Sequence, residues 1–292
     1  MTVLDHRLLL AQDYALINPL QVDSSLWHDL PLVPLSPKEL AAKPVSMPRL
    51  LALREMTEHD CLQLLQRVHE QARRNKYPYF SALIVSSRTT RELSAQLAER
   101  MIVRVRDRRN AILRYFDPRV FRHLRWILNK TQMDSLLRSV AVWTWLTPDG
   151  NWTQHQCANA ASPSRLRLTD KQWEALQRLR LLHRCLEQMA IHVPKTLNDD
   201  AIAQHVDALL HLAYTEYGLR DGDDRSLYAL QAARFHPRIG EHPEIRIRLC
   251  KVQKGDISYV GACADLSDDA LSRFAGQLAS NVPPTSTSGM SS

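Results

Sequence analysis

Strand-length apolar runs are confined to residues 1–160 of this chain, whereas apolar residues at helical spacing dominate the remainder. The two patterns have periods of two and of 3.6 residues, so they predict different structures. We therefore expect an α+β or α/β fold with an N-terminal mixed α/β lobe over residues 1–160 and an all-helical C-terminal lobe over residues 165–279. Residues 280–292 are poor in apolar side chains and are expected to form a disordered tail.

Three apolar runs in the first lobe are predicted to be strands. They are YALINP (residues 14–19), LLAL (residues 50–53) and FSALIV (residues 80–85), of which the last is typical of a buried strand. Five prolines between residues 31 and 48 exclude a long regular helix from the connection between the first two runs.

Two helices are predicted around these strands. Thr57 can cap a helix that extends to about Arg74, with Asp60 in its first turn. Thr89 and Glu92 have the spacing of a capping box, which predicts the start of a second helix.

Two hairpins are predicted further along the first lobe. In the first, MIVRVRD and AILRYF flank a short polar turn, and valines alternate with arginines. In the second, VAVWTWL and NWTQHQC flank the Pro-Asp-Gly turn of TPDG. We expect a small sheet that includes both hairpins.

The segment LRYFDPRVFRHL (residues 113–124) combines basic, aromatic and acidic residues around a proline. Asp117 followed by Pro118 is a typical helix start, because the carboxylate accepts from unpaired backbone N–H groups and proline at the first helical position loses no hydrogen bond. A helix cap is therefore favoured over an acid catalyst at Asp117. Arg114 and Arg119 can either form ion pairs at this joint or face a partner.

The second lobe is predicted to be helical throughout. Thr169 and Gln172 form a capping box at the start of a helix, and a later helix ends near Gly218. Further helices are expected at residues 226–234, 244–252 and 267–278. DGDDRS (residues 221–226) is interpreted as a turn and helix cap rather than a calcium loop, because arginine and alanine stand where calcium ligands are required.

The charge of the chain is moderately basic, with 38 Lys and Arg residues, 31 Asp and Glu residues and a formal net charge of +7. The cluster Arg104, Arg106, Arg108 and Arg109 is the main concentration of positive charge. It is interpreted as a solvated hairpin rim or as a surface for an acidic partner. Nucleic acid is a lesser alternative because no aromatic residues are interleaved with the arginines.

Motifs for catalysis, cofactors or metals are missing from the sequence. The chain has eight glycines and no glycine-rich phosphate loop, and its histidines do not have metal-ligand spacing. The five cysteines are scattered, which favours a reduced, cytoplasmic setting. We expect no cofactor, no metal, no signal peptide and no membrane span.

Aromatic residues of the second hairpin form a further candidate surface. Trp143 and Trp145 lie two residues apart and so fall on one face of the predicted strand, with Trp152 on the partner strand. Core packing is favoured over ligand stacking.

The order of these features resembles the cytoplasmic adaptor, or chaperone, family of bacterial type VI secretion systems, the Tap or Tec adaptors. The resemblance covers SALIVSSRTTRELSAQLAERMIVRVRDRRNAILRYFDPRVFRHLRWIL and DSLLRSVAVWTWLTPDGNW. The family motif R-[FY]-[FY]-D-P-R-V corresponds here to residues 114–120. In place of the His-Leu-Arg run that is common in the family, this chain has AQLAERMIV.

The resemblance implies a non-enzymatic protein that binds a secreted effector and helps to load it onto the VgrG spike. The candidate partner-binding or motif residues are Arg104, Arg106, Arg114, Tyr115, Asp117, Pro118, Arg119, Trp143 and Trp145. A basic nucleic-acid-binding regulator is the alternative that the charge allows. A hydrolase that uses His123 or His155 is the third.

Overall fold

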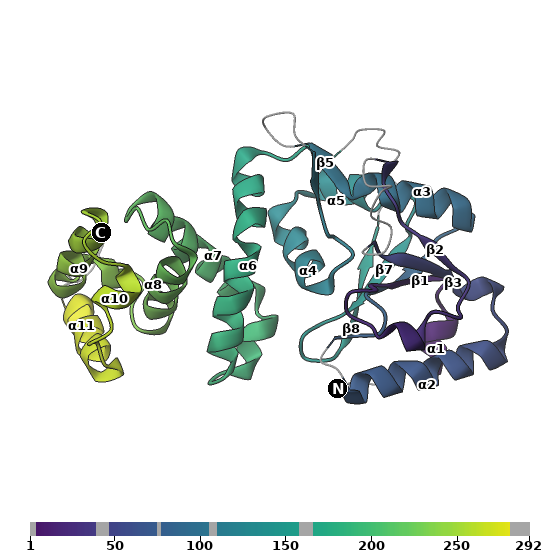
Figure 1. The fold of residues 1–292 in the computed structure, drawn as a ribbon, viewed down its shortest axis with the longest axis horizontal. Helices are drawn as coiled ribbons and strands as arrows, with labels where there is room; N and C mark the ends of the chain where they lie inside the picture. The colour runs from purple at the N-terminus through teal and green to yellow at the C-terminus, as the bar shows by residue number, and fades with distance from the viewer. Residues whose placement is uncertain (1–3, 39–46, 75–76, 105–109, 158–165, 281–292) are drawn as a thin grey trace, which may run out of the picture. The chain divides into compact units, whose positions relative to one another are not determined.

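The computed structural model describes residues 4–38, 47–74, 77–104, 110–157 and 166–280. The chain divides into two compact units, residues 1–176 and 177–292. The first unit is mixed α/β and the second is helical, as predicted (Figure 1). The predicted lobe boundary at residues 160–165 and most of the predicted tail lie outside the described residues.

A six-stranded antiparallel sheet forms the centre of the first unit, with strand order β2-β3-β1-β4-β7-β8. Its strands are β1 (Tyr14–Ile17), β2 (Leu32–Pro34), β3 (Arg49–Ala52), β4 (Ala82–Val85), β7 (Val142–Leu146) and β8 (Trp152–Gln156). The strands expected in YALINP, LLAL and FSALIV are therefore confirmed. Strand β2 lies in the proline-rich connection and was not predicted. It accommodates Pro34 because it is an edge strand, where a missing backbone donor is tolerated.

The two predicted hairpins both form, but the expectation that one sheet includes both of them is wrong. Strands β5 (Ile102–Arg104) and β6 (Asn110–Ile112) make a separate two-stranded sheet. The reason is that β4 pairs with β1 on one edge and with β7 on the other, so the chain between β4 and β7 has no free edge of β4 to pair with.

Helices cover both faces of the large sheet (Figure 1). On one face, α1 (His6–Leu10) and α2 (Glu58–Arg74) pack against a buried cluster that includes Ile17, Leu51 and Leu83. The other face carries α3 (Thr90–Arg100) and α4 (Pro118–Ile127), and α5 (Lys130–Leu136) follows. Because both faces are covered, all four residues of β1 are buried.

Local capping explains where the helices of the first unit begin. The predicted capping box at Thr89 and Glu92 is present, with both reciprocal hydrogen bonds. At the start of α2, the Thr57 hydroxyl accepts from the Asp60 backbone N–H, and the Asp60 carboxylate accepts from the Thr57 N–H, each at 3.2 Å. These contacts satisfy donors that a helix end leaves without intrahelical partners.

The second unit contains α7 (Asp200–Thr215), α8 (Gly222–Arg234), α9 (Pro243–Gln253), α10 (Tyr259–Ala262) and α11 (Asp268–Ser280). The division between the units falls within α6 (Asp170–Ala190). Asp221 caps α8 by accepting from the backbone N–H groups of Asp223 and Asp224, which confirms the cap predicted in DGDDRS. None of the helices in the described ranges is long and apolar enough to cross a membrane.

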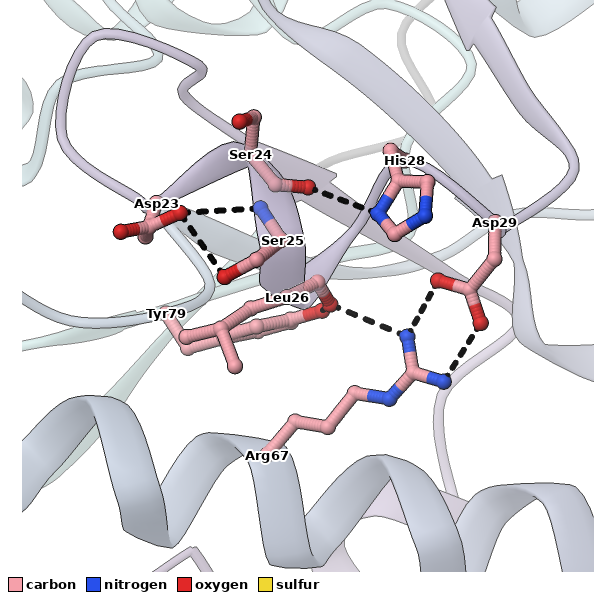
Figure 2. Close-up of polar contacts among 8 residues, drawn as sticks. All are labelled: Asp23, Ser24, Ser25, Leu26, His28, Asp29, Arg67 and Tyr79. Atoms are coloured by element: carbon pink, nitrogen blue, oxygen red, sulfur yellow. Dashed lines mark hydrogen bonds and ion pairs between the residues drawn. The ribbon is translucent and has the colours of Figure 1, made fainter.

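The loop after β1 is held against α2 by a polar cluster that Figure 2 shows. Arg67 of α2 donates to both carboxylate oxygens of Asp29, each at 2.6 Å, and to the Leu26 carbonyl at 3.1 Å. The Tyr79 hydroxyl donates to the same carbonyl at 2.6 Å. Asp23 caps the short 3₁₀ turn that contains Leu26. Two elements that are distant in sequence therefore fix one loop carbonyl.

The Arg67–Asp29 pair predicts an acid-sensitive contribution to stability. Hydrogen bonds from Arg67 lower the pKa of Asp29 from 3.8 to about 2. The pair therefore stabilises the fold fully above pH 3.8, and this contribution is lost as the pH falls through 2. Asp29→Asn should flatten the decline in the free energy of unfolding over this interval.

Tryptophan fluorescence during urea unfolding is a suitable measurement, because all six tryptophans belong to the first unit. Asp256→Asn, which removes an exposed carboxylate from the second unit, is the matched control. If Asp29→Asn and the control decline with pH as steeply as the parent chain, Arg67 does not hold Asp29 ionised.

Candidate partner-binding site

The motif at residues 114–120 forms the joint between the small hairpin and α4. Leu113 extends the hairpin by donating its N–H to the Met101 carbonyl at 2.8 Å. Tyr115 is buried, and its hydroxyl donates to the Leu97 carbonyl of α3 at 2.9 Å. Exposed Arg114 lies over the ring of buried Phe116, with 5.6 Å from guanidinium carbon to ring centroid. The motif thus anchors the hairpin to α3.

Asp117 is buried at the start of α4 and has the capping role that the sequence predicts. One carboxylate oxygen accepts from the Arg119 backbone N–H at 3.0 Å and from Arg119 Nε at 3.1 Å, and the other accepts from Nη2 at 2.8 Å. Pro118 occupies the first turn. Burial alone would raise the pKa of Asp117, but the Arg119 hydrogen bonds hold it below its usual value. The charged carboxylate is thus a structural acceptor.

Of the two arginines that the sequence left open, Arg119 forms the ion pair. Its guanidinium lies between Asp117 and the Tyr77 ring, whose centroid is 5.3 Å away. The Arg119 side chain is still 45% exposed. Arg114 faces solvent, so of these two residues Arg114 is the better placed to contact a partner.

Tyr115, Trp143 and Trp145 lie in the core of the first unit. The Phe121 ring stacks on Trp143 at 5.2 Å and packs against Trp145 at 4.9 Å, and Tyr115 lies 5.6 Å from Trp143. Each of the three candidate aromatics is at most 1% exposed. They attach α4 and the motif to β7, and they do not offer an exposed stacking surface.

An arginine-lined pocket lies beside the small hairpin. It has a volume of about 220 Å³ and is lined by Glu99, Arg100, Ile102, Arg104, Asn110, Leu166 and Arg167. An isolated parallel bridge between the backbones of Arg104 and Arg167 places these two residues side by side. Both are exposed, and neither makes an ion pair with another described residue. The remaining arginines predicted for this cluster, Arg106, Arg108 and Arg109, lie outside the described residues.

The residues that line the pocket favour binding of a carboxylate over catalysis. Guanidinium groups present several N–H donors in a plane and bind carboxylates through two parallel hydrogen bonds. Ile102 and Leu166 add apolar lining. The sequence predicted Arg104 as a candidate binding residue but did not predict Arg100 or Arg167. Residue 167 is distant in sequence and lies beside residue 104 only in the folded chain.

The groups considered for catalysis are buried or half-buried. His123 is fully buried, and its Nδ1 accepts from Trp126 Nε1 at 3.3 Å. Burial lowers the pKa of His155 and raises the pKa of the Cys157 thiol to about 12. Within the described ranges, no three His, Cys, Asp or Glu side chains are grouped so that they could hold a metal ion.

Part of the first unit matches a protein-family model. A family model described as Domain of unknown function (DUF4123) matches residues 32–135. The matched stretch runs from β2 into α5, so it includes Arg104 and the motif at residues 114–120. No curated protein and no solved structure matches the chain.

The buried position of Asp117 predicts that its replacement costs more than the loss of an ordinary cap. Asp117→Ala should lower the free energy of unfolding by about 2–3 kcal/mol, because it removes the cap and leaves Arg119 without its acceptor. Asp117→Asn keeps a capping oxygen and should cost less. Urea unfolding followed by tryptophan fluorescence measures both.

Thr89→Ala is the matched control because it removes an exposed cap from α3, for which a loss of about 1 kcal/mol is expected. A cost for Asp117→Ala no larger than that of Thr89→Ala would contradict the structural role of the Arg119 contacts.

Proposed function

We propose that this chain is a non-enzymatic cytoplasmic adaptor of a type VI secretion system, which binds an effector protein and helps to load it onto the VgrG spike. The observation that carries the proposal is the family-model match over residues 32–135, combined with the R-Y-F-D-P-R-V motif inside it. The order of strand, helix, hairpin, motif and tryptophan-bearing strand is the order found in the Tap or Tec adaptors that the sequence resembles.

The surface of the first unit supports a binding role. An adaptor must recognise another protein without keeping it permanently, which favours polar and charged contacts around a limited apolar area. The arginine-lined pocket has this composition, since Arg104 and Arg167 stand beside Ile102 and Leu166. Ile112 of β6 adds an apolar side chain that is 43% exposed. We assign the pocket and this strand to the effector or the spike.

The motif has an indirect part in this proposal. Its aromatic and acidic residues hold the hairpin to α3 and α4, which fixes the position of Arg104 relative to the rest of the first unit. Replacing a motif residue should therefore weaken partner binding through loss of structure, whereas replacing Arg104 should weaken it without loss of structure.

Co-purification tests the proposed function. The tagged chain, co-expressed with the VgrG and effector candidates encoded beside it, should retain one of them on an affinity column. Absence of any complex with all neighbouring gene products would contradict the adaptor role. Salt-sensitive binding to DNA or RNA that depends on Arg104 would instead favour the nucleic-acid alternative.

The pocket predicts a further outcome for the same complex. Arg104→Glu should weaken partner binding about tenfold by placing a carboxylate where a partner's acidic group is proposed to bind. Arg91→Glu is the matched control, because Arg91 is exposed near the other end of α3. Binding measured by biolayer interferometry and thermal unfolding measured in parallel separate lost contact from lost structure; equal affinities for the two variants would exclude the pocket.

A further inference from the structure

A second group of arginines gathers around Tyr214 in the helical unit. The guanidinium carbon of Arg220 lies 4.1 Å from the Tyr214 ring centroid, and that of Arg225 lies 5.2 Å from it. Tyr214 belongs to α7 and Arg225 to α8, while Arg220 lies in the loop between them. Two guanidinium groups therefore share one aromatic ring, which is itself 42% exposed.

Asp207, a carboxylate that acts electrostatically on Arg225, already pairs with Arg178. Arg178 donates from Nε and Nη2 to the two oxygens of Asp207, at 2.9 and 2.8 Å, and both side chains are 11% exposed. This pair is neutral overall and largely shielded from solvent. Arg220 and Arg225 make no ion pair with any residue in the described part of the chain.

Arg225 has unused hydrogen-bonding capacity. Its Nη2 donates to the Leu210 carbonyl at 3.4 Å, but its Nε is buried without a hydrogen-bond partner. Leaving a buried donor unpaired is costly, and a cationic donor more so. Burial, together with repulsion from Arg178 and Arg220, lowers the pKa of Arg225. An incoming anion would relieve the repulsion between these like charges.

We infer that Arg220 and Arg225, with Tyr214 as their platform, form a binding site for an aspartate or glutamate side chain of a partner protein. A carboxylate held by two guanidinium groups gains charge-assisted hydrogen bonds. This inference rests on the proposed adaptor function, which it deepens by assigning an acidic segment to the partner.

The surroundings favour a protein carboxylate over nucleic acid. Glu216 and Asp221, both exposed, lie in the same short connection as Arg220. Acidic neighbours oppose a chain of phosphates, which requires an extended run of positive charge. A single carboxylate side chain needs only the local pair of arginines.

The site can be tested without knowing the partner. A fluorescein-labelled hexaglutamate peptide is the probe, and its fluorescence anisotropy is measured with the full chain. Arg220→Ala and Arg225→Ala should each weaken binding at least fivefold, and Arg220→Lys, which retains the charge but not the planar fork, should give an intermediate loss. Arg246→Ala removes an equal charge from an exposed position on α9 and should leave the affinity unchanged.

Three outcomes decide the inference. It is overturned if Arg220→Ala binds the peptide as the parent chain does, or if Arg246→Ala weakens binding equally. Because Arg220 is exposed, its replacement keeps the test valid even if Arg225→Ala unfolds the second unit. Tighter binding of an oligothymidylate of equal length, lost in the same variants, would assign the site to nucleic acid instead.

The co-purification experiment separates this inference from the proposed function. If the parent chain captures no VgrG or effector but binds the peptide through Arg220, the site stands and the adaptor role fails. If the parent chain captures a partner, while Arg220→Ala neither weakens that capture nor alters peptide binding, the adaptor role stands and the site fails.

Discussion

The fold of the first unit depends on the pairing of β4 along both of its edges. Ile84 lies beside Tyr14 of β1 on one edge and beside Trp143 of β7 on the other. A strand with two neighbours accepts no third, so the long segment between β4 and β7 cannot pair with β4, and its hairpin forms a separate sheet. That segment holds α3, the small hairpin, the motif and α4. The pairing of one central strand therefore keeps Arg104 and the motif residues Arg114 to Arg119 outside the large sheet.

The motif then fixes the position of this segment between β4 and β7. Asp117 fixes the first turn of α4, Phe121 one turn later stacks on Trp143, and Tyr115 reaches the Leu97 carbonyl. These contacts connect the segment to β7 and to α3 at separate points. Because such side chains are held by packing and hydrogen bonds, the hairpin that carries Arg104 has a defined base. The segment LRYFDPRVFRHL is thus a structural joint, with Asp117 as a helix cap.

Features set by neighbours in sequence were predictable, and features set by distant contacts were not. The caps at Thr89, Asp117 and Asp221 follow from residues within four positions, so the sequence located them. The separate sheet of β5 and β6, by contrast, depends on which strand takes the last free edge of β4. Arg67 and Asp29 are 38 residues apart, and no local pattern relates them. For the same reason, the sequence did not predict that Arg167 lines the pocket or that Arg220 and Arg225 lie over the Tyr214 ring.

The arginines of this chain differ in whether they pair with a carboxylate inside the fold. This difference separates structural arginines from those proposed to bind a partner. Arg67, Arg119 and Arg178 each donate to both oxygens of a carboxylate, so their charge is balanced inside the fold. Removing one partner of such a pair leaves the other charge unpaired, which destabilises the fold, so these pairs hold elements together. Arg104, Arg167, Arg220 and Arg225 have no carboxylate partner among the described residues. Arginines that the fold leaves unbalanced, and places beside apolar or aromatic groups, are the ones whose hydrogen bonds remain for another molecule to complete. Arginines that lack an internal carboxylate partner therefore indicate the proposed recognition surfaces, and each of the two units contains such arginines.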